Sequence, residues 1–168
     1  MSTESKAASS NATFAAGCFW GVEDIFLNTP GVLKTTVGYT GGTTQNPTYE
    51  TVCTGTTQHA EAVLIEFDPH RITYEALLDL FWRLHDPTTP NRQGPDIGTQ
   101  YRSAIFYHSD EQKRQTEVSM HMLEKSARFK HPVVTQLLPA TTFYPAEDYH
   151  QQYFKKRGIS GCHVLRAH

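Results

Sequence analysis

The chain has 168 residues, of which 38% are hydrophobic, and its formal net charge at pH 7 is −2. This length fits one compact domain with a buried core, and this charge is too small to indicate nucleic acid or an anionic membrane as a partner. No apolar run approaches the roughly 20 residues that cross a bilayer, so the composition argues against a membrane-spanning protein.

The N-terminus, residues 1–11, is rich in Ser and Ala and carries both Glu4 and Lys6. It has neither the apolar core of a secretion signal nor the Arg-rich character of a transit peptide. We therefore expect a flexible tail over residues 1–11, a single domain over residues 12–168 and a cytoplasmic location.

A strand, a turn and a helix are predicted to open the domain. Residues 13–16 form a short apolar run that ends at Gly17. From Cys18 the apolar residues recur at helical spacing until Pro30 ends the helix. Cys18 is thus expected close to a helix N-terminus, and residues 32–39 predict the next strand.

Two long irregular stretches flank a strand and a helix in the middle of the chain. Residues 40–58 are rich in Thr and Gly and show little hydrophobic periodicity, which in a compact domain indicates a functional or disordered loop. Residues 62–67 predict a strand, and residues 74–85 predict an amphipathic helix with Thr73 as its N-cap. Residues 86–101 form the second irregular stretch.

The last third of the chain predicts two strands, two helices and a tail. The strands are expected at residues 103–107 and 133–138. A polar helix is expected from Asp110 to about Arg128, and a second over residues 145–156, where acidic residues at the start suit the helix dipole. A tail with two glycines follows from Gly158.

This irregular alternation of strands and helices favours an α+β domain over a doubly wound sheet. The predicted fold is an α/β (α+β) two-layer sandwich, with a mixed sheet, flanking helices, long loops and an irregular C-terminal tail. We expect the arrangement of a ferredoxin-like plait.

The three cysteines, Cys18, Cys53 and Cys162, argue against a disulfide scaffold because their number is odd and low. No two of them lie at metal-binding spacing, so we expect no structural zinc and no other metal. Cys18 is the candidate nucleophile, since a helix N-terminus stabilises the reactive thiolate. The next two residues, Phe19 and Trp20, offer aromatic surfaces that suit a small apolar group. Taken alone, this segment fits a buried, inert cysteine equally well.

The segment Gly17–Gly21 (GCFWG) resembles the signature of the class A peptide methionine sulfoxide reductases. Further blocks follow in the order found in that family: GYTGG at 38–42, NPTY at 46–49, HAEA at 59–62, HDP at 85–87, GPDIGTQYRS at 94–103 and YPAEDYHQQY at 144–153. The resemblance extends from about Phe14 to Cys162. It implies an enzyme that reduces methionine S-sulfoxide, free or in proteins, to methionine and so repairs oxidised proteins.

The resemblance also implies the catalytic residues. Cys18 would attack the sulfoxide sulfur and become a sulfenic acid, while Glu61, Tyr49 and Tyr101 match the family's proton and hydrogen-bond donors to the sulfoxide oxygen. Without the resemblance, a Glu at the start of a strand is usually a solvated residue, and tyrosines in such loops are usually surface anchors. Glu61 acts as an acid only if burial keeps its proton in place.

Substrate-binding residues follow from the same match. Phe19 and Trp20 would form the pocket for the S-methyl group of the substrate. Asp96 falls on the position of an acidic residue near the family's site, where it would hold the loop or the substrate backbone. His85 and Asp86 could form a base and its orienting partner, but the match favours a structural turn.

Recycling of the sulfenic acid requires a second thiol. Cys162 is preferred over Cys53 because Gly158 and Gly161 flank it in the tail, which we therefore expect to serve recycling. The commoner family pattern has Gly-Tyr shortly before a tail cysteine, and this chain departs from it. The family implies thioredoxin as the external reductant, with dithiothreitol as its substitute in vitro. We expect no bound cofactor, and nothing requires more than a monomer.

Two other functions remain open at this stage. A peroxidase or a cysteine hydrolase could use a cysteine at a helix start, and a hydrolase would pair it with a histidine such as His59 or His150. A module that only binds methionine sulfoxide or a peptide would use the aromatic residues and leave Cys18 incidental.

Overall fold

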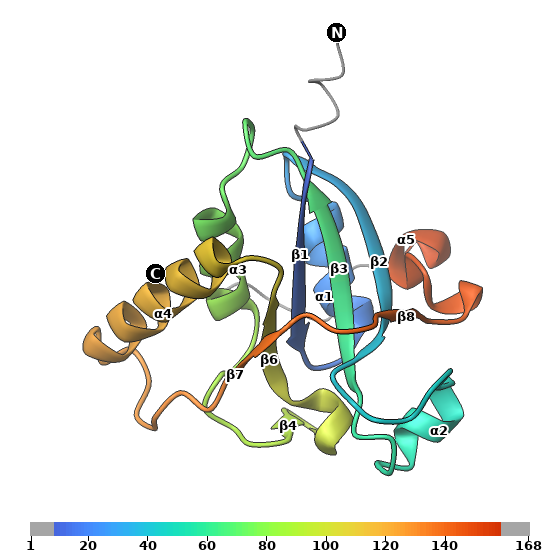
Figure 1. The fold of residues 1–168 in the computed structure, drawn as a ribbon. Helices are drawn as coiled ribbons and strands as arrows, with labels where there is room; N and C mark the ends of the chain where they lie inside the picture. The colour runs from blue at the N-terminus through green and yellow to red at the C-terminus, as the bar shows by residue number, and fades with distance from the viewer. Residues whose placement is uncertain (1–8, 159–168) are drawn as a thin grey trace, which may run out of the picture.

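The computed structural model describes residues 9–158, and one mixed sheet lies at its centre (Figure 1). The strand order is β7-β6-β1-β3-β2-β8, and neighbouring strands are antiparallel except β6 and β7, which are parallel. The strands are β1 (Ser10–Ala16), β2 (Val32–Thr40), β3 (Ala60–Phe67), β6 (Ser103–Tyr107), β7 (Gln136–Pro139) and β8 (Tyr144–Pro145). A mixed sheet with flanking helices confirms this part of the predicted fold.

Two helices cover one face of the sheet, and a third packs outside them. α1 (Phe19–Leu27) lies behind the central strands in Figure 1, α3 (Tyr74–Leu84) packs against β1, and α4 (Asp110–Lys125) packs on α3. The Phe14 ring of β1 lies 5.6 Å from the Phe26 ring of α1 and 5.1 Å from the Phe81 ring of α3. These rings are fully buried and hold α1 firmly against the sheet.

Four alanines and one phenylalanine are buried on the opposite face, where a chain segment crosses the sheet. The buried residues of this face are Ala15, Ala60, Ala62, Ala104 and Phe106. Residues 140–143 lead from β7 at one edge to β8 at the other, and this segment runs in front of the sheet in Figure 1. A Cβ on Gly38 would lie 2.6 Å from the Phe143 ring, so the crossing segment requires glycine at this position of β2.

Most predicted elements up to α4 occur at the expected place with shifted ends. β6 has the predicted bounds, and α3 and α4 end one and three residues early, at Leu84 and Lys125. β1 begins at Ser10, inside the predicted tail, because Ser10 and Asn11 pair with the end of β3. Their polar side chains concealed this pairing from a hydrophobic pattern.

The loop predicted over residues 40–58 contains the short helix α2 (Tyr49–Cys53). Thr48 caps this helix, since its hydroxyl accepts from the Thr51 N–H while the Thr51 side chain accepts from the Thr48 N–H. His59 fixes the rest of the loop: its Nδ1 accepts from the Gly42 N–H at 3.0 Å and its Nε2 lies 2.6 Å from the Thr44 carbonyl oxygen. The loop is therefore anchored along its length.

The helix predicted over residues 145–156 is wrong. The chain forms β8, a 3-10 turn η3 (Asp148–His150) and a short helix α5 (Tyr153–Arg157), with Gln152 in a left-handed conformation at φ +52°. The Gln151 side chain bonds to both the N–H and the carbonyl of Val37, and the Gln152 N–H donates to Glu23 Oε1 at 2.7 Å. These contacts with distant residues outweigh the local preference for helix.

The strand predicted over residues 133–138 is shorter and begins later, at Gln136. Val134 donates its N–H to the Pro87 carbonyl at 2.8 Å, and the Thr135 hydroxyl bonds to Ser103 at 2.7 Å. The β-branched residues before Gln136 therefore anchor the second irregular stretch instead of extending the sheet. That stretch holds the hairpin of β4 (Arg92–Gln93) and β5 (Asp96–Ile97) and the 3-10 turn η2 (Thr99–Tyr101).

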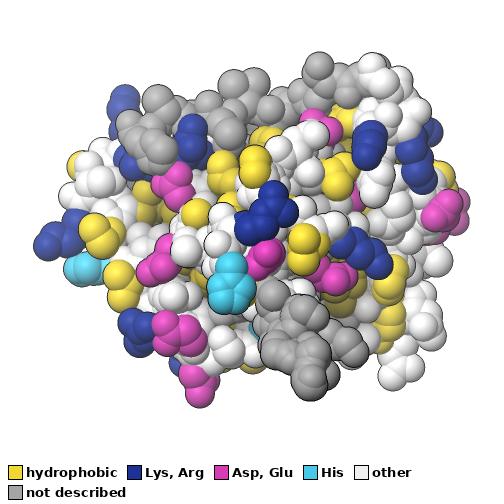
Figure 2. All heavy atoms as spheres, turned by 90° about the horizontal axis from the view of Figure 1, so that it is seen from above, with side chains coloured by type: hydrophobic (Ala, Val, Ile, Leu, Met, Phe, Trp, Pro, Cys, Tyr) yellow, Lys and Arg dark blue, Asp and Glu magenta, His cyan; other side chains and the backbone are white. Residues whose placement is uncertain are grey.

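Figure 2 shows the molecule from above, relative to Figure 1. The surface on this side carries charged and hydrophobic side chains together. Basic and acidic side chains alternate there, with hydrophobic side chains in small groups between them. Among the described residues, none of the helices combines the length and the apolar character needed to cross a membrane.

Candidate active site

Cys18 lies at the junction between β1 and α1, as predicted. Gly17 turns the chain there with φ +99°, a conformation that residues with a Cβ rarely adopt, and a Cβ would also lie 2.9 Å from the Gln93 side chain. Cys18 is the N-cap residue of α1 and is partly exposed. The thiol therefore occupies the start of a helix at the edge of the core, within reach of solvent.

Glu61 lies beside this helix start. It is the second residue of β3, and its Oε1 accepts a hydrogen bond from the Phe19 N–H at 3.2 Å. Its side chain is only 2% exposed, and Oε2 is buried without a hydrogen-bond partner among the described residues. One carboxyl oxygen beside the start of α1 is thus left for another group.

Burial raises the pKa of Glu61 to about 8, because the ionised form loses its solvation. The hydrogen bond from Phe19 lowers this pKa in part, and the charge of Asp96 raises it. The carboxyl is therefore mostly protonated at neutral pH. The structure has the burial that the predicted role of Glu61 as an acid requires.

Tyr49 and Tyr101 come from the two irregular stretches. Tyr49 begins α2, and Tyr101 ends η2, which packs against β3. Burial raises the pKa of both hydroxyls, and the charge of Glu61 raises both pKa values further. Both phenols therefore lie close enough to Glu61 to interact with its charge. A hydrogen bond to Cys53 also raises the pKa of Tyr49. Both phenols therefore keep their protons and are available as donors at neutral pH.

Asp96 is a half-buried residue of β5. Its charge raises the pKa of both Glu61 and Tyr101, so it belongs to the same cluster. The hairpin of β4 and β5 carries it there, and Arg92 supports the hairpin turn through hydrogen bonds to the Gly94 carbonyl. The structure thus brings Asp96 together with the predicted donors.

The aromatic residues after Cys18 have different environments. Phe19 is 1% exposed and packs on Tyr39 and His150, with ring centroids 5.7 Å and 5.3 Å away. Trp20 is half-buried, stacks on Tyr153 at 3.7 Å, and donates its Nε1–H to His150 Nδ1 at 2.9 Å. Phe19 is therefore mainly a core residue, whereas Trp20 is held rigidly in a partly exposed aromatic cluster.

Glu147 is a residue that the sequence did not single out for the site. Its Oε1 accepts from the Tyr39 hydroxyl and its Oε2 from the Tyr49 N–H, both at 2.9 Å. Burial alone would raise the pKa of Glu147, but these hydrogen bonds and the nearby His150 lower it below its usual value. The block YPAEDYHQQY contains Glu147 and His150. The helix predicted over that block gave no reason to expect either residue to contact the segment that forms α2.

The other cysteines lie in different parts of the chain. Cys53 is the last residue of α2 and is exposed, and its thiol shares a hydrogen bond with Tyr49. Cys162, the preferred recycling cysteine, lies outside the described residues.

The histidines that were considered as catalytic bases are held by structural hydrogen bonds. Both ring nitrogens of His59 contact backbone groups of the loop before β3. His85 bonds to the Phe81 carbonyl and the Ser103 hydroxyl, each at 2.7 Å. His150 Nδ1 accepts from Trp20, since an indole N–H can only donate. His85–Asp86 is thus a structural turn, as predicted, with the Asp86 carboxylate bonded to Thr88.

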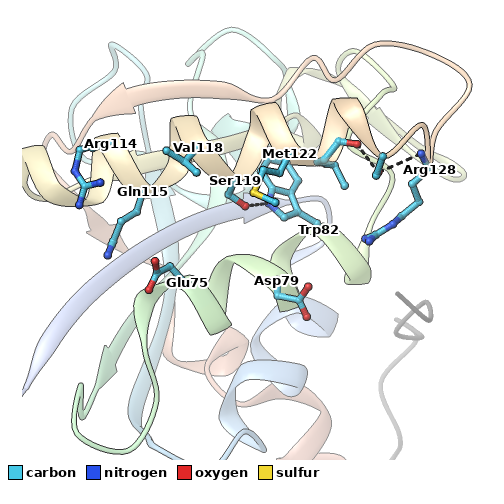
Figure 3. Close-up of a pocket in the computed structure, with 11 residues that line it drawn as sticks. Glu75, Asp79, Trp82, Arg114, Gln115, Val118, Ser119, Met122 and Arg128 are labelled. Atoms are coloured by element: carbon cyan, nitrogen blue, oxygen red, sulfur yellow. Dashed lines mark hydrogen bonds between the residues drawn. The ribbon is translucent and has the colours of Figure 1, made fainter.

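A pocket of about 430 Å³ lies between α3 and α4 (Figure 3). Trp82, Val118 and Met122 provide its apolar wall, with Glu75 and Arg114 at its edge, and Trp82 donates to Ser119 at 2.8 Å. None of the predicted site residues lines it. Within residues 9–158, no group of three or more His, Cys, Asp or Glu side chains has an arrangement that could hold a metal ion.

Comparison with known proteins identifies the family of this chain. The family model described as "Peptide methionine sulfoxide reductase" matches residues 10–168. The chain belongs to the peptide methionine sulfoxide reductase family. A relative named MsrA from Methanoculleus marisnigri is 58% identical over 92% of this chain and 94% of its own length. Another, from Methanosarcina mazei, is 62% identical over 88% of this chain and 70% of its own length. Membership in this family makes the chain an oxidoreductase.

Solved structures of the family have the same fold. Mxr1 from Saccharomyces cerevisiae in reduced form is 38% identical, with a TM-score of 0.84 over 96% of this chain and 94% of that chain. Methionine sulfoxide reductase A of Corynebacterium diphtheriae is also 38% identical, with a TM-score of 0.79 over 92% of this chain and 78% of that chain. Mxr1 in complex with Trx2 is 28% identical, with a TM-score of 0.62 over 96% of this chain and 92% of that chain.

Proposed function

We propose that this chain reduces the S epimer of methionine sulfoxide, free and in proteins, with Cys18 as the nucleophile. The observation that carries the proposal is the buried Glu61 carboxyl, which contacts the residue after Cys18 and has a pKa raised to about 8. Attack on a sulfoxide sulfur drives negative charge onto its oxygen, and a protonated acid beside the thiol meets this requirement.

The sulfoxide step transfers one oxygen atom. The Cys18 thiolate attacks the sulfur, and Glu61 gives its proton to the sulfoxide oxygen as charge develops there. The oxygen then passes to Cys18 as a sulfenic acid, methionine leaves, and sulfoxide sulfur is reduced while cysteine sulfur is oxidised. The Tyr49 and Tyr101 hydroxyls donate hydrogen bonds to the same oxygen, and Asp96 holds the substrate backbone.

The S-methyl group of the substrate binds against Trp20, with Phe19 behind it. The fixed orientation of Trp20, stacked on Tyr153 and hydrogen-bonded to His150, supports this assignment. A rigid apolar wall loses little entropy on binding a methyl group. The same wall offers nothing to a charged substituent at the sulfur.

Recycling uses the thiol of Cys162. That thiol condenses with the Cys18 sulfenic acid, which releases water and forms a disulfide. The dithiol of thioredoxin, or dithiothreitol in vitro, then reduces the disulfide by exchange. The complex of the homologous Mxr1 with Trx2 supports thioredoxin as the partner. We further propose a monomeric, cytoplasmic enzyme.

We also propose that the centre of the fold is a ferredoxin-like plait. The antiparallel order β6-β1-β3-β2 supports this, with α1 connecting β1 to β2 and α3 between β3 and β6. The parallel strand β7 and the short strand β8 are then additions at the two edges of the plait.

Separated S and R epimers of methionine sulfoxide test the proposed activity, with dithiothreitol as reductant and methionine release as the readout. Reduction of the S epimer alone is expected, with no release by Cys18→Ser and continued release by Cys53→Ser. Reduction of the R epimer alone would contradict the proposal. Hydrolysis of an ester or reduction of a peroxide, without methionine release, would favour the other thiol chemistries.

A further inference from the structure

A pocket of about 430 Å³ lies between the loop over residues 40–58, the β4–β5 region and β7. Gln58, Asn91 and Thr99 line it, and Arg102 and Gln136 complete its polar wall. None of the residues assigned to the sulfoxide reaction lines it. Among the described residues that line it, Arg102 is the only charged one.

Arg102 is a half-buried cation with neutral partners. Its Nε donates to Gln136 Oε1 at 2.9 Å and its Nη1 to the Thr99 carbonyl oxygen at 3.0 Å. These bonds use two of the five N–H donors of a guanidinium, and no carboxylate among residues 9–158 forms an ion pair with it. Burial lowers the pKa of Arg102, and no described acidic group offsets the cost.

The pocket lining also contains a buried hydroxyl. The Thr99 hydroxyl is buried without a hydrogen-bond partner among the described residues, which in a native structure often indicates a missing ion or water. Gln58 and Asn91 also line the pocket, where both residues are exposed. Both residues have left-handed backbones, at φ +64° and +52°, a strain that is common in binding loops.

We propose that this pocket binds a small oxyanion, such as phosphate or a short carboxylate, on the guanidinium of Arg102. The N–H donors of Arg102 that remain, one on Nη1 and both on Nη2, fit the paired oxygens of such anions. The amides of Gln58 and Asn91 at the rim donate to the remaining oxygens. This site does not depend on the proposed sulfoxide reaction.

Titration of the reduced, full-length protein followed by 15N–1H NMR tests the site. Inorganic phosphate and citrate are the probes, and chloride at matched ionic strength is the reference. We expect saturable shifts of the Gly41, Thr99 and Arg102 amide signals with phosphate, with citrate or with both. The probe that causes the shifts shows whether the site takes an inorganic anion or a carboxylate. The Tyr101 amide should shift too, because Thr99 and Arg102 flank it.

Matched variants test the role of Arg102. Arg102→Gln should weaken binding about tenfold or more, since a hydrogen bond to a charged group is worth roughly 1.5–3 kcal/mol. Asn91→Asp keeps the shape of the side chain and adds a repelling charge, so it should also weaken binding and serves if Arg102→Gln fails to fold. Arg71→Gln removes an exposed charge elsewhere and should have no effect.

Shifts that rise linearly without saturation would overturn the proposal. Binding of equal affinity in Arg102→Gln or in Asn91→Asp would overturn it as well. Equal shifts with chloride would show that ionic strength alone causes them, and this result would contradict a specific oxyanion site.

Discussion

Glu61 and Glu147 are two carboxyl groups of one site with opposite protonation preferences. Glu61 is buried with an unpartnered oxygen and keeps its proton, whereas Glu147 accepts hydrogen bonds from Tyr39 and from the Tyr49 backbone and stays ionised. Environments that separate two such pKa values divide the tasks between an acid and a charged anchor. Glu147 fixes α2, which carries Tyr49, while Glu61 keeps the proton that the proposed sulfoxide step requires.

Substitutions of Glu61 should separate proton donation from hydrogen bonding. Glu61→Gln keeps an N–H donor and should slow single-turnover methionine release less than Glu61→Ala does. The alanine variant loses the donor, and loss of one preorganised donor typically costs about 10²–10³ in rate. Rapid quench of reduced enzyme with one equivalent of sulfoxide measures this step without recycling. Unchanged release by Glu61→Ala would refute the assignment.

The pH dependence of the same step should follow Glu61. Its pKa of about 8 means that the acid is present at neutral pH and is lost as the pH rises through that value. We expect the single-turnover rate of the wild type to fall above pH 8 and this fall to be absent in Glu61→Gln. A profile that keeps rising to pH 10 in the wild type would contradict an acid role.

The same shift has a consequence for stability. A carboxyl whose pKa is raised on folding favours the folded state at low pH, and this contribution disappears as the pH passes the folded pKa. The contribution of Glu61 is therefore complete below about pH 4.5, the ordinary pKa of the group, is lost between that value and about pH 8, and stays constant above it. The glutamine variant should lose less stability than the wild type over that range in urea unfolding.

At the scale of elements, the sequence pattern predicted the helices and turns whose ends are determined by their own residues. The turn at Gly17 and the cap at Thr73 occur as expected, since each depends on its own φ angle or hydroxyl group. Cys18 was a candidate from its position at a helix start, whereas Glu61, Tyr49 and Tyr101 came from the family resemblance; the structure places all four at one end of the sheet. Their chemical roles stay predictions.

Elements held by distant partners were not predictable in this way. Glu147 and Asp148 are good residues for a helix start, yet Glu147 bonds across the fold and Gln151 pairs with the β2 backbone. A single-sequence pattern does not contain such contacts, so the predicted helix over residues 145–156 concealed β8. For the same reason His150 entered only as a partner for a hydrolase.

The crossing segment gives a prediction for element stability. Gly38→Ala would place a methyl group 2.6 Å from the Phe143 ring and against the Tyr144 carbonyl, so β8 must shift. Such overpacking typically costs about 1–3 kcal/mol. Urea unfolding measures the loss, and Leu33→Ala, on an exposed residue of the same strand, should change stability by only about 0.5 kcal/mol. An unchanged midpoint for Gly38→Ala would contradict the tight crossing.

At the scale of the whole molecule, the recycling path depends on which thiol meets Cys18. Cys53 is exposed but its thiol already interacts with Tyr49, which favours a supporting position over a recycling one. We predict a Cys18–Cys162 disulfide after one equivalent of sulfoxide in the absence of reductant. Peptide mapping by mass spectrometry identifies it, and Cys53→Ser should give the same product.

The Cys162→Ser variant is the matched counterpart of that experiment. It should still release one equivalent of methionine and then accumulate a sulfenic acid on Cys18, which dimedone labels. A Cys18–Cys53 disulfide in the wild type would reverse the order of the two candidates. Loss of the first methionine equivalent in Cys162→Ser would assign this cysteine to the sulfoxide step itself.

The segment that crosses the alanine-lined face determines when the site is complete during synthesis. Glu147 and His150 follow β8, which pairs with β2 across more than a hundred residues of chain. A chain emerging from the ribosome presents Cys18 first, and pairings of this sequence separation form late. The nascent protein therefore carries its thiol for most of its synthesis without His150 and Tyr153, the partners of Trp20, which emerge after β8, the last strand in chain order.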